Sequence, residues 1–114
     1  MREAEGTALL RARFTEAGYT IAENFHFHEG DVEVDLDGWD AAARVGYEYL
    51  TEEAGDFKQF DAATLARFEA RMAKGELFVL LVDEHEAITA EALEAAAHGF
   101  LAELARRKAE SRAP

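Results

Sequence analysis

The sequence contains no cysteine, and its only serine and only proline, Ser111 and Pro114, lie at the C-terminus. The lack of cysteine excludes a disulfide framework and metal sites built from thiolates. It also removes a cysteine nucleophile, and Ser111 lies in a polar terminal segment where a Ser-His-Asp triad has no credible place. A glycine-rich phosphate-binding loop is missing from the sequence as well. Several large enzyme classes are therefore excluded.

Long apolar runs are also missing. The longest, residues 77–82, is far shorter than the roughly 20 residues that a transmembrane helix needs. Residues 1–5 are mostly charged or polar and lack the apolar core of a signal peptide. With the absence of cysteine, these features predict a cytoplasmic protein without a membrane span. The length of 114 residues and a hydrophobic content of 49% predict one folded domain over residues 1–114.

Basic residues are scarce, because 12 lysines and arginines face 24 acidic residues, for a net charge of −12. The acidity is concentrated in residues 23–57, where eleven acidic residues accompany one basic residue, Arg44, for a net −10. Such a surface repels phosphate backbones and attracts metal ions or a basic protein partner. We therefore expect no direct binding of nucleic acid. The alternative explanation is a charged surface that only maintains solubility.

The hydrophobic pattern predicts seven elements. Val32, Val34 and Leu36 alternate with acidic residues, which is typical of a strand with one buried face. Residues 77–82 are apolar throughout and predict a strand in the centre of the sheet, covered on both faces. Residues 105–114 are predicted to form a frayed tail. The expected elements are a helix over 2–17, strands over 19–28, 31–37 and 44–50, a helix over 61–74, a strand over 77–82 and a helix from residue 89.

This order predicts an α+β sandwich of two or three layers. The first three strands form an antiparallel meander, and the fourth joins it after a right-handed crossover. The last helix carries small residues over 92–96. They leave two alternatives for its packing, against its own domain or against a second subunit in a homodimer.

The strand pattern also predicts a metal site. His26 and His28 lie two residues apart and share one face of their strand, and acidic side chains line the same face of the neighbouring strands. Side chains directly opposite each other on adjacent strands have Cβ atoms about 5 Å apart. Imidazoles with carboxylates suit zinc, iron or nickel, and carboxylates alone suit magnesium or manganese. The alternative is a solvated polar face without a ligand. The predicted ligands are His26, His28, Asp35, Asp37 and Glu48.

The element order and two of these acids resemble the restriction-endonuclease-like superfamily with its PD-(D/E)xK signature. That family places an Asp at the end of the second strand and an acid-x-Lys motif on the third. Asp35 or Asp37 matches the first acid, and Glu48-Tyr49-Leu50 matches the motif except that Leu50 replaces the lysine. The resemblance implies an acid pair that binds magnesium in a relative without nuclease activity, because the missing lysine helps to activate the attacking water.

Two functions follow from these observations. The one we favour is a non-enzymatic module that holds a basic protein partner on its acidic hairpin face, through Glu33, Trp39 and Asp40. Trp39 is either an exposed anchor for that partner or a hydrophobic plug beneath the hairpin. The second function is a divalent-metal-dependent enzyme, or a degenerate nuclease-like domain, with carboxylates on adjacent strands. Enzymatic activity is thus left open at this point.

Overall fold

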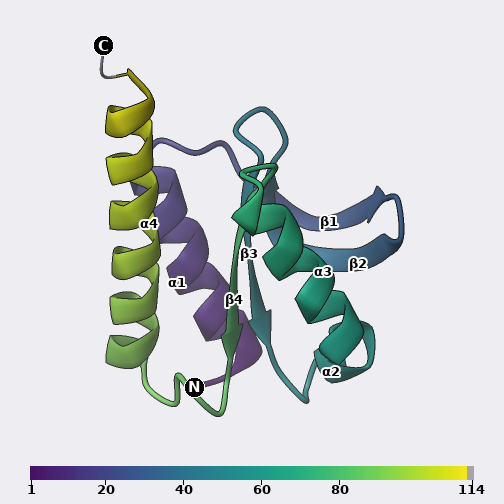
Figure 1. Cartoon of the computed structure of the whole chain (residues 1–114). Coiled ribbons are helices and arrows are strands. Elements are labelled where there is room, and N and C mark those ends of the chain that lie inside the picture. The colour runs from purple at the N-terminus through teal and green to yellow at the C-terminus, as the bar shows by residue number, and fades with distance from the viewer. Residues whose placement is uncertain (113–114) are drawn as a thin grey trace.

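The structure is a computed structural model that describes residues 1–112. Four strands form one mixed sheet, with helices on both of its faces (Figure 1). The predicted α+β class and the predicted order of elements are confirmed, and a short helix, α2, is added. No helix within residues 1–112 combines the length and the apolar character needed to cross a bilayer. The elements are α1 (Glu3–Glu16), β1 (Ala22–Glu29), β2 (Val32–Asp40), β3 (Val45–Leu50), α2 (Asp56–Gln59), α3 (Ala62–Ala73), β4 (Phe78–Asp83) and α4 (Ala90–Arg112).

The strand order is β1-β2-β3-β4, with β1 to β3 antiparallel and β4 parallel to β3. The predicted meander is confirmed, but β4 lies at an edge of the sheet, so its predicted central position is wrong. The strand is apolar on both faces because helices cover both faces: Leu80 packs towards α1 and α4, and Val79 packs towards α3. Coverage of two faces does not require a neighbouring strand on each side.

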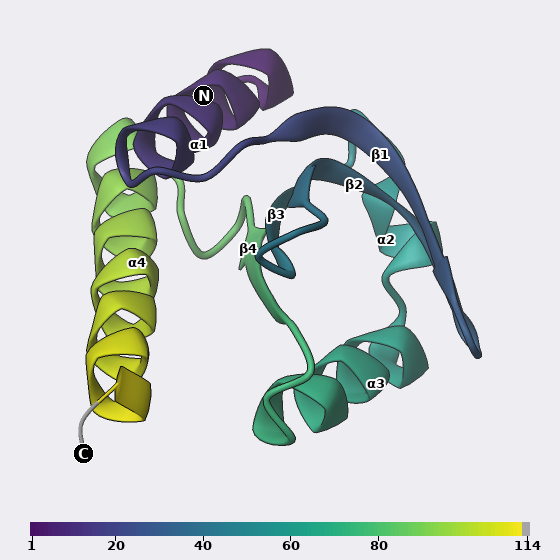
Figure 2. The same ribbon diagram turned by 90° about the horizontal axis from the view of Figure 1, so that it is seen from above.

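Two clusters of buried side chains make up the core, one on each face of the sheet (Figure 2). In the first, Leu10 and Phe14 of α1 and Leu93 of α4 pack against the tyrosines of β3. In the second, Phe68 of α3 packs against the β1-β2 hairpin, where Phe27 is buried. Removing this apolar surface from water is the main driving force for folding. The molecule is therefore a sandwich of three layers.

Helix α4 extends to Arg112 and so includes residues 105–112 of the segment predicted to fray; residues 113 and 114 lie outside the described part. Arg106 forms ion pairs with Glu103 and Glu110, one turn away in each direction. The Lys108 ammonium donates a hydrogen bond to the Tyr19 hydroxyl at 2.9 Å. Of the two packing alternatives, α4 lies against α1 of its own domain.

Candidate carboxylate site

The site forms where strands β2 and β3 separate. They pair over three positions only, from Asp40–Val45 to Gly38–Tyr47, and the rest of β2 continues with β1 as a two-stranded arm (Figures 1 and 2). One step further in the same register, Asp37 would stand opposite Glu48. Backbone groups that lose their strand partner must find another one when they are buried.

At the point of separation, Asp37 and Glu48 replace the missing backbone acceptors with their own side chains. The Asp37 N–H donates to Glu48 Oε1 at 2.8 Å, and the Tyr49 N–H donates to Asp37 Oδ2 at 2.8 Å. Glu48 is only 1% exposed. The two acids predicted on adjacent strands therefore meet, and Asp37 rather than Asp35 is the direct neighbour of Glu48.

Two further acids complete a row of four carboxyl groups. Asp56, the first residue of α2, is buried, and its Oδ2 accepts a hydrogen bond from the Thr51 N–H at 3.0 Å. Glu3, in the first turn of α1, is half-buried and is hydrogen-bonded to Asp37. The row runs Glu3, Asp37, Glu48, Asp56 and draws on α1, β2, β3 and α2.

The sequence analysis missed Glu3 and Asp56, because neither belongs to the strand pattern. One signal for Glu3 is present in the sequence, namely Gly6 inside an otherwise regular helix. Gly6 lies directly against the Tyr49 ring, where any Cβ atom would clash. The glycine therefore lets α1 approach β3 closely, which brings the first turn of the helix to the pocket.

These acids line a pocket of about 320 Å³, and no Lys, Arg or His is among the described residues that line it. Burial, followed by contact with Asp37, raises the pKa of Glu48 to about 11. Burial and the charge of Asp37 raise the pKa of Glu3 to about 7, and burial also raises the pKa of Asp37. At neutral pH Glu48 is therefore a neutral acid, hydrogen-bonded to the carboxyl groups of Asp37 and Asp56, and its single O–H donates to one of them at a time.

In this structure the carboxyl groups of the pocket hydrogen-bond to backbone N–H groups and to one another. Within residues 1–112, no three Asp, Glu or His side chains already surround a common position for a metal ion. Asp37, Glu48 and Asp56 each use one oxygen to accept a backbone N–H, and carboxyl-to-carboxyl contacts link them to one another. Binding of a cation therefore requires that Glu48 release its proton and that these side chains turn towards one shared point.

The five predicted metal ligands divide into two groups. The pairs His26–Asp35 and His28–Glu33 in the strand register confirm that these side chains share a face. His26, His28 and Glu33 lie on the exposed part of the arm, however, outside the lining of the pocket that contains Glu48. His26 Nδ1 is 2.7 Å from Asp35 Oδ1, and its Nε2 is 2.8 Å from Glu33 Oε2. The hydrogen bonds to Asp35 and then Glu33 raise the pKa of His26 above its usual value.

Asp35 lies between the two groups, at the wall of the pocket. Its N–H donates to Gln59 Oε1, and its Oδ2 accepts from Gln59 Nε2, both at 3.0 Å. Asp35 thus joins the exposed arm to α2 and helps to hold one side of the pocket in place.

The predicted partner-binding residues are mostly buried. Trp39 is 3% exposed and packs edge-on against the Phe27 ring, which agrees with a hydrophobic plug and not with an exposed anchor. Asp40 is 8% exposed, and its carboxylate accepts hydrogen bonds from the N–H groups of Thr20 and Ala43. Glu33 alone of the three remains on the surface.

Much of the acidic charge of the hairpin is balanced by basic side chains of the same chain. Arg44 forms two hydrogen bonds to the Glu29 carboxylate, at 2.7 and 2.9 Å. Arg67 and Arg71 of α3 reach across to Asp31, at 3.0 and 3.1 Å. Arg44 is already counted in the net −10 of residues 23–57, but Arg67 and Arg71 are not, so that figure overstates the charge that this surface offers to a partner.

Leu50 is the residue that the predicted resemblance places at the position of the PD-(D/E)xK lysine. It is 4% exposed and belongs to the apolar cluster beneath the hairpin. This position therefore supplies no cation to the carboxylate pocket. Comparison of the chain with protein-family models, with curated proteins and with solved structures gave no match.

Proposed function

We propose that this protein is a divalent-cation-binding domain, with Asp37, Glu48 and Asp56 as the ligands and Glu3 at the side of the same pocket. The observation that carries the proposal is a row of four carboxyl groups, from four separate elements, in a pocket lined by no basic side chain. Burial of several acids together is costly unless protons or cations neutralise them. Carboxylate oxygens are the preferred ligands of magnesium and manganese, so we propose one of these ions.

The proposal includes a relationship to the restriction-endonuclease-like superfamily, supported by the element order and by the meeting of Asp37 with Glu48. It does not include phosphodiester hydrolysis. A bound metal ion can polarise a phosphate oxygen and lower the pKa of a bound water. The buried Leu50 leaves no ammonium group at the motif position to assist that water.

A basic protein partner, which the charge of the sequence favours, is the weaker proposal. Two of its three predicted contact residues, Trp39 and Asp40, are buried, and the neighbouring acids Glu29 and Asp31 are paired with arginines. Exposed ion pairs of this kind contribute little to stability, but they reduce the negative potential that would attract a partner.

A thermal-shift series on chelator-treated protein tests the cation proposal. Magnesium or manganese at 100 times its dissociation constant should add about 2.7 kcal/mol, which is several degrees for a domain of this size. Asp37→Asn and Glu48→Gln should abolish the shift. Glu33→Gln, which removes a carboxylate from the exposed arm, should keep it. The absence of any shift at millimolar magnesium, manganese or calcium would refute the proposal.

A second series of measurements distinguishes ion binding in the pocket from ion binding by the histidines of the exposed arm. Zinc and nickel are added to wild type, to His26→Gln and to Glu48→Gln. A shift lost in His26→Gln but kept in Glu48→Gln would place zinc or nickel on the exposed arm and not in the pocket. Calorimetry in two buffers of different ionisation enthalpy adds a further check, because cation binding at neutral pH should release the proton held by Glu48.

A further inference from the structure

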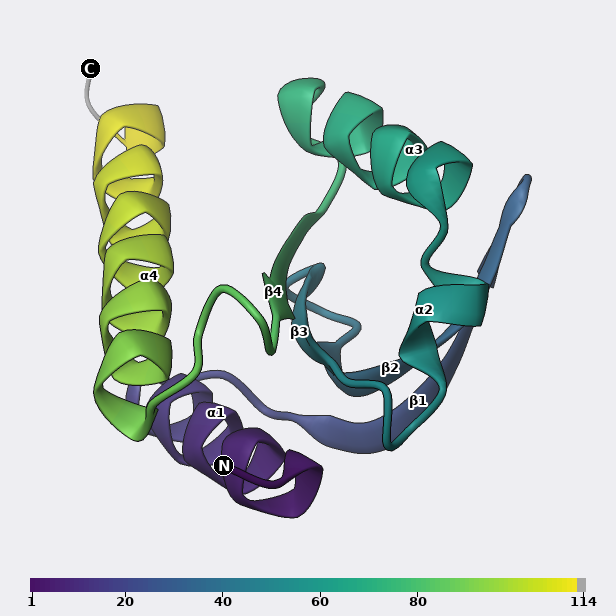
Figure 3. The same ribbon diagram turned by 90° about the horizontal axis from the view of Figure 1, so that it is seen from below.

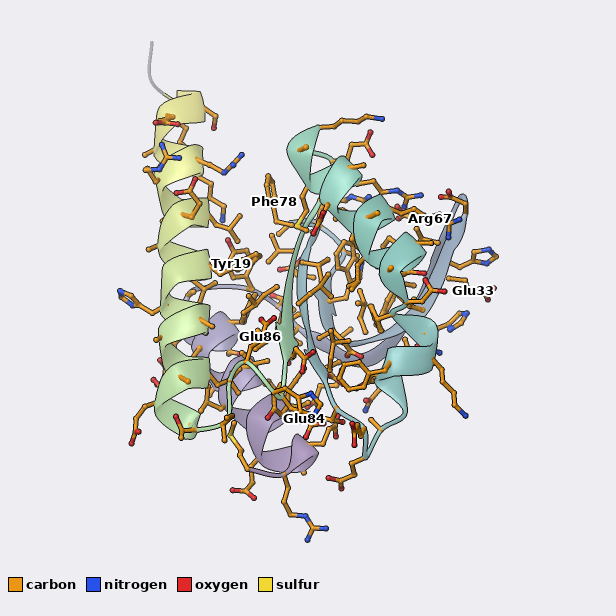
Figure 4. The ribbon with its side chains drawn as sticks, turned by 60° about the horizontal axis from the view of Figure 1, so that its bottom comes forward. Tyr19, Glu33, Arg67, Phe78, Glu84 and Glu86 are labelled. Atoms are coloured by element: carbon orange, nitrogen blue, oxygen red, sulfur yellow. The ribbon has the colours of Figure 1, made fainter. Side chains whose placement is uncertain are left out.

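Two histidines on the arm formed by β1 and β2 remain outside the proposed carboxylate site. His26 and His28 lie two residues apart on β1 and are exposed, on the face opposite to the buried Phe27. In the strand register Asp35 lies across from His26, and Glu33 lies across from His28. Figure 3 shows the arm passing beside α2, and Figure 4 shows Glu33 on the opposite side of the molecule from α4. Two imidazoles and two carboxylates therefore share one exposed face of the arm.

One oxygen atom, Glu33 Oε2, lies close to both imidazoles. It is 2.8 Å from His26 Nε2 and 3.8 Å from His28 Nδ1. Zinc binds such nitrogen and oxygen donors at about 2.0–2.2 Å, so a tetrahedral ion holds two of them about 3.3 Å apart. The two distances in this structure lie on either side of that value. A small turn of the exposed Glu33 carboxylate, away from His26 and towards His28, therefore brings both distances to those of donors on one ion.

A hydrogen bond to Asp35 orients the His26 ring. His26 Nδ1 is 2.7 Å from Asp35 Oδ1, and Asp35 Oδ2 is held in turn by Gln59 Nε2 at 3.0 Å. A histidine that ligates a metal ion through one ring nitrogen generally donates its other N–H to a carboxylate, a backbone carbonyl or a water. The contact with Asp35 assigns that role to Nδ1. It leaves Nε2, the nitrogen beside Glu33, as the atom that binds the ion.

We propose that His26, His28 and Glu33 bind a zinc ion, with Asp35 as the residue that positions His26. Imidazole nitrogen suits zinc, whereas magnesium and manganese prefer sites made of oxygen atoms alone. Glu33 and Asp35 carry two negative charges, which match the two positive charges of the ion. Three protein ligands leave the fourth position of a tetrahedral ion open to water, as the exposure of these side chains allows. The proposal does not depend on cation binding in the carboxylate pocket.

A zinc titration of chelator-treated protein, in competition with a colorimetric zinc indicator, tests the site. We expect one zinc ion per chain, bound at micromolar concentrations. His26→Gln, His28→Gln and Glu33→Gln should each weaken binding by about tenfold or more, because each removes one ligand. These side chains are exposed, so the variants should fold like the wild type. No zinc binding by the wild type at these concentrations would overturn the proposal.

His85 provides the matched control. It is also exposed, and its Nδ1 is 2.8 Å from Asp83 Oδ1, but the histidine nearest to it in the sequence is His98, in α4. His85→Gln should leave the affinity for zinc unchanged, and so should Glu48→Gln, which alters only the carboxylate pocket. Zinc binding that survives in His26→Gln but is lost in either control overturns the arm as the site. A magnesium shift in the pocket can be present or absent independently of this result.

NMR of the imidazole rings locates the ion and tests the role of Asp35. Zinc should move the ring signals of His26 and His28 and leave those of the other two histidines in place. Asp35→Asn should weaken binding by about tenfold, as loss of a residue that orients a ligand does. In that variant the nitrogen signal of His26 Nδ1 should also change while that of His28 does not, which a general loss of structure would not produce. Movement of the His85 ring in place of His26 and His28 overturns the proposal.

Discussion

Asp37 and Glu48 complete each other's strands: the Asp37 amide donates to the Glu48 carboxyl, and the Asp37 carboxylate accepts from the amide that follows Glu48. Each acid therefore has two roles, as an acceptor for a backbone N–H and as a member of a row of carboxyl groups. Substitutions that keep the acceptor but remove the ionisable proton separate these roles.

Glu48→Gln should leave the free energy of unfolding of the metal-free protein within about 1 kcal/mol of wild type, because the amide oxygen still accepts from Asp37. Glu48→Ala should lower it by about 2–4 kcal/mol, since it leaves a buried N–H without a partner and opens a cavity. Urea denaturation at pH 4.5, where protonation of Glu48 on folding costs little, measures both. Equal losses in the two variants would show that the acceptor role is unimportant.

The metal-free protein should become less stable as the pH rises from 5 to 9. Glu48 ionises near 4.5 when unfolded but at about 11 when folded, so the folded state holds more protons across this range and the slope is negative. Glu3, with a folded pKa of about 7, adds to the slope below neutrality. One proton corresponds to about 1.4 kcal/mol per pH unit. Chemical denaturation at several pH values should show a much shallower slope in Glu48→Gln.

His26 should titrate above 6.5, because hydrogen bonds to Asp35 and Glu33 favour its charged form. The side chain lies on the exposed arm, so NMR of the imidazole protons follows it directly. Asp35→Asn should lower the pKa of His26 more than Glu33→Gln does, since Asp35 is the larger cause. A titration that neither variant moves would contradict the described contacts. The stability that these contacts give is present below pH 6.5 and is lost as the pH rises through the folded pKa.

Two helical glycines should respond in opposite ways to alanine. Gly6→Ala places a methyl group against the Tyr49 ring and should cost about 1–3 kcal/mol despite the better helix propensity of alanine. Gly99→Ala, in α4, has no atom within 4 Å of the new methyl group and should stabilise the protein by up to about 1 kcal/mol. Thermal unfolding of both variants tests this contrast. If Gly6→Ala is neutral, α1 is free to move away from β3.

The sequence predicted the strands and their exposed faces because alternation is a local property. Val32, Val34 and Leu36 alternate with acids, and the structure buries all three. The edge position of β4 was not predictable in this way. An apolar strand sequence indicates only that both faces of the strand are covered. Here the covering side chains come from helices that lie far apart in the chain.

The candidate site was only partly predictable, for a related reason. Asp37 and Glu48 belong to neighbouring strands, so the strand pattern brings them together. Glu3 and Asp56 reach the pocket from a helix start and from a turn, where no periodic pattern exists to place them. Conversely, Trp39 and Asp40 lie in an acidic stretch that suggested a surface, yet both are buried: Trp39 packs against Phe27, and Asp40 accepts a hydrogen bond from the Thr20 N–H.

The packing of α1 against α4 has a consequence for synthesis in the cell. Leu10 and Phe14 of α1 share one core cluster with the tyrosines of β3 and with Leu93 and Leu104 of α4, so this apolar surface is fully covered only after α4 has been made. Contacts between distant parts of a chain slow folding, and exposed apolar surface during that delay favours aggregation. Until α4 has been made, the nascent chain therefore keeps part of the apolar face of α1 uncovered, which makes it a candidate for chaperone binding during translation.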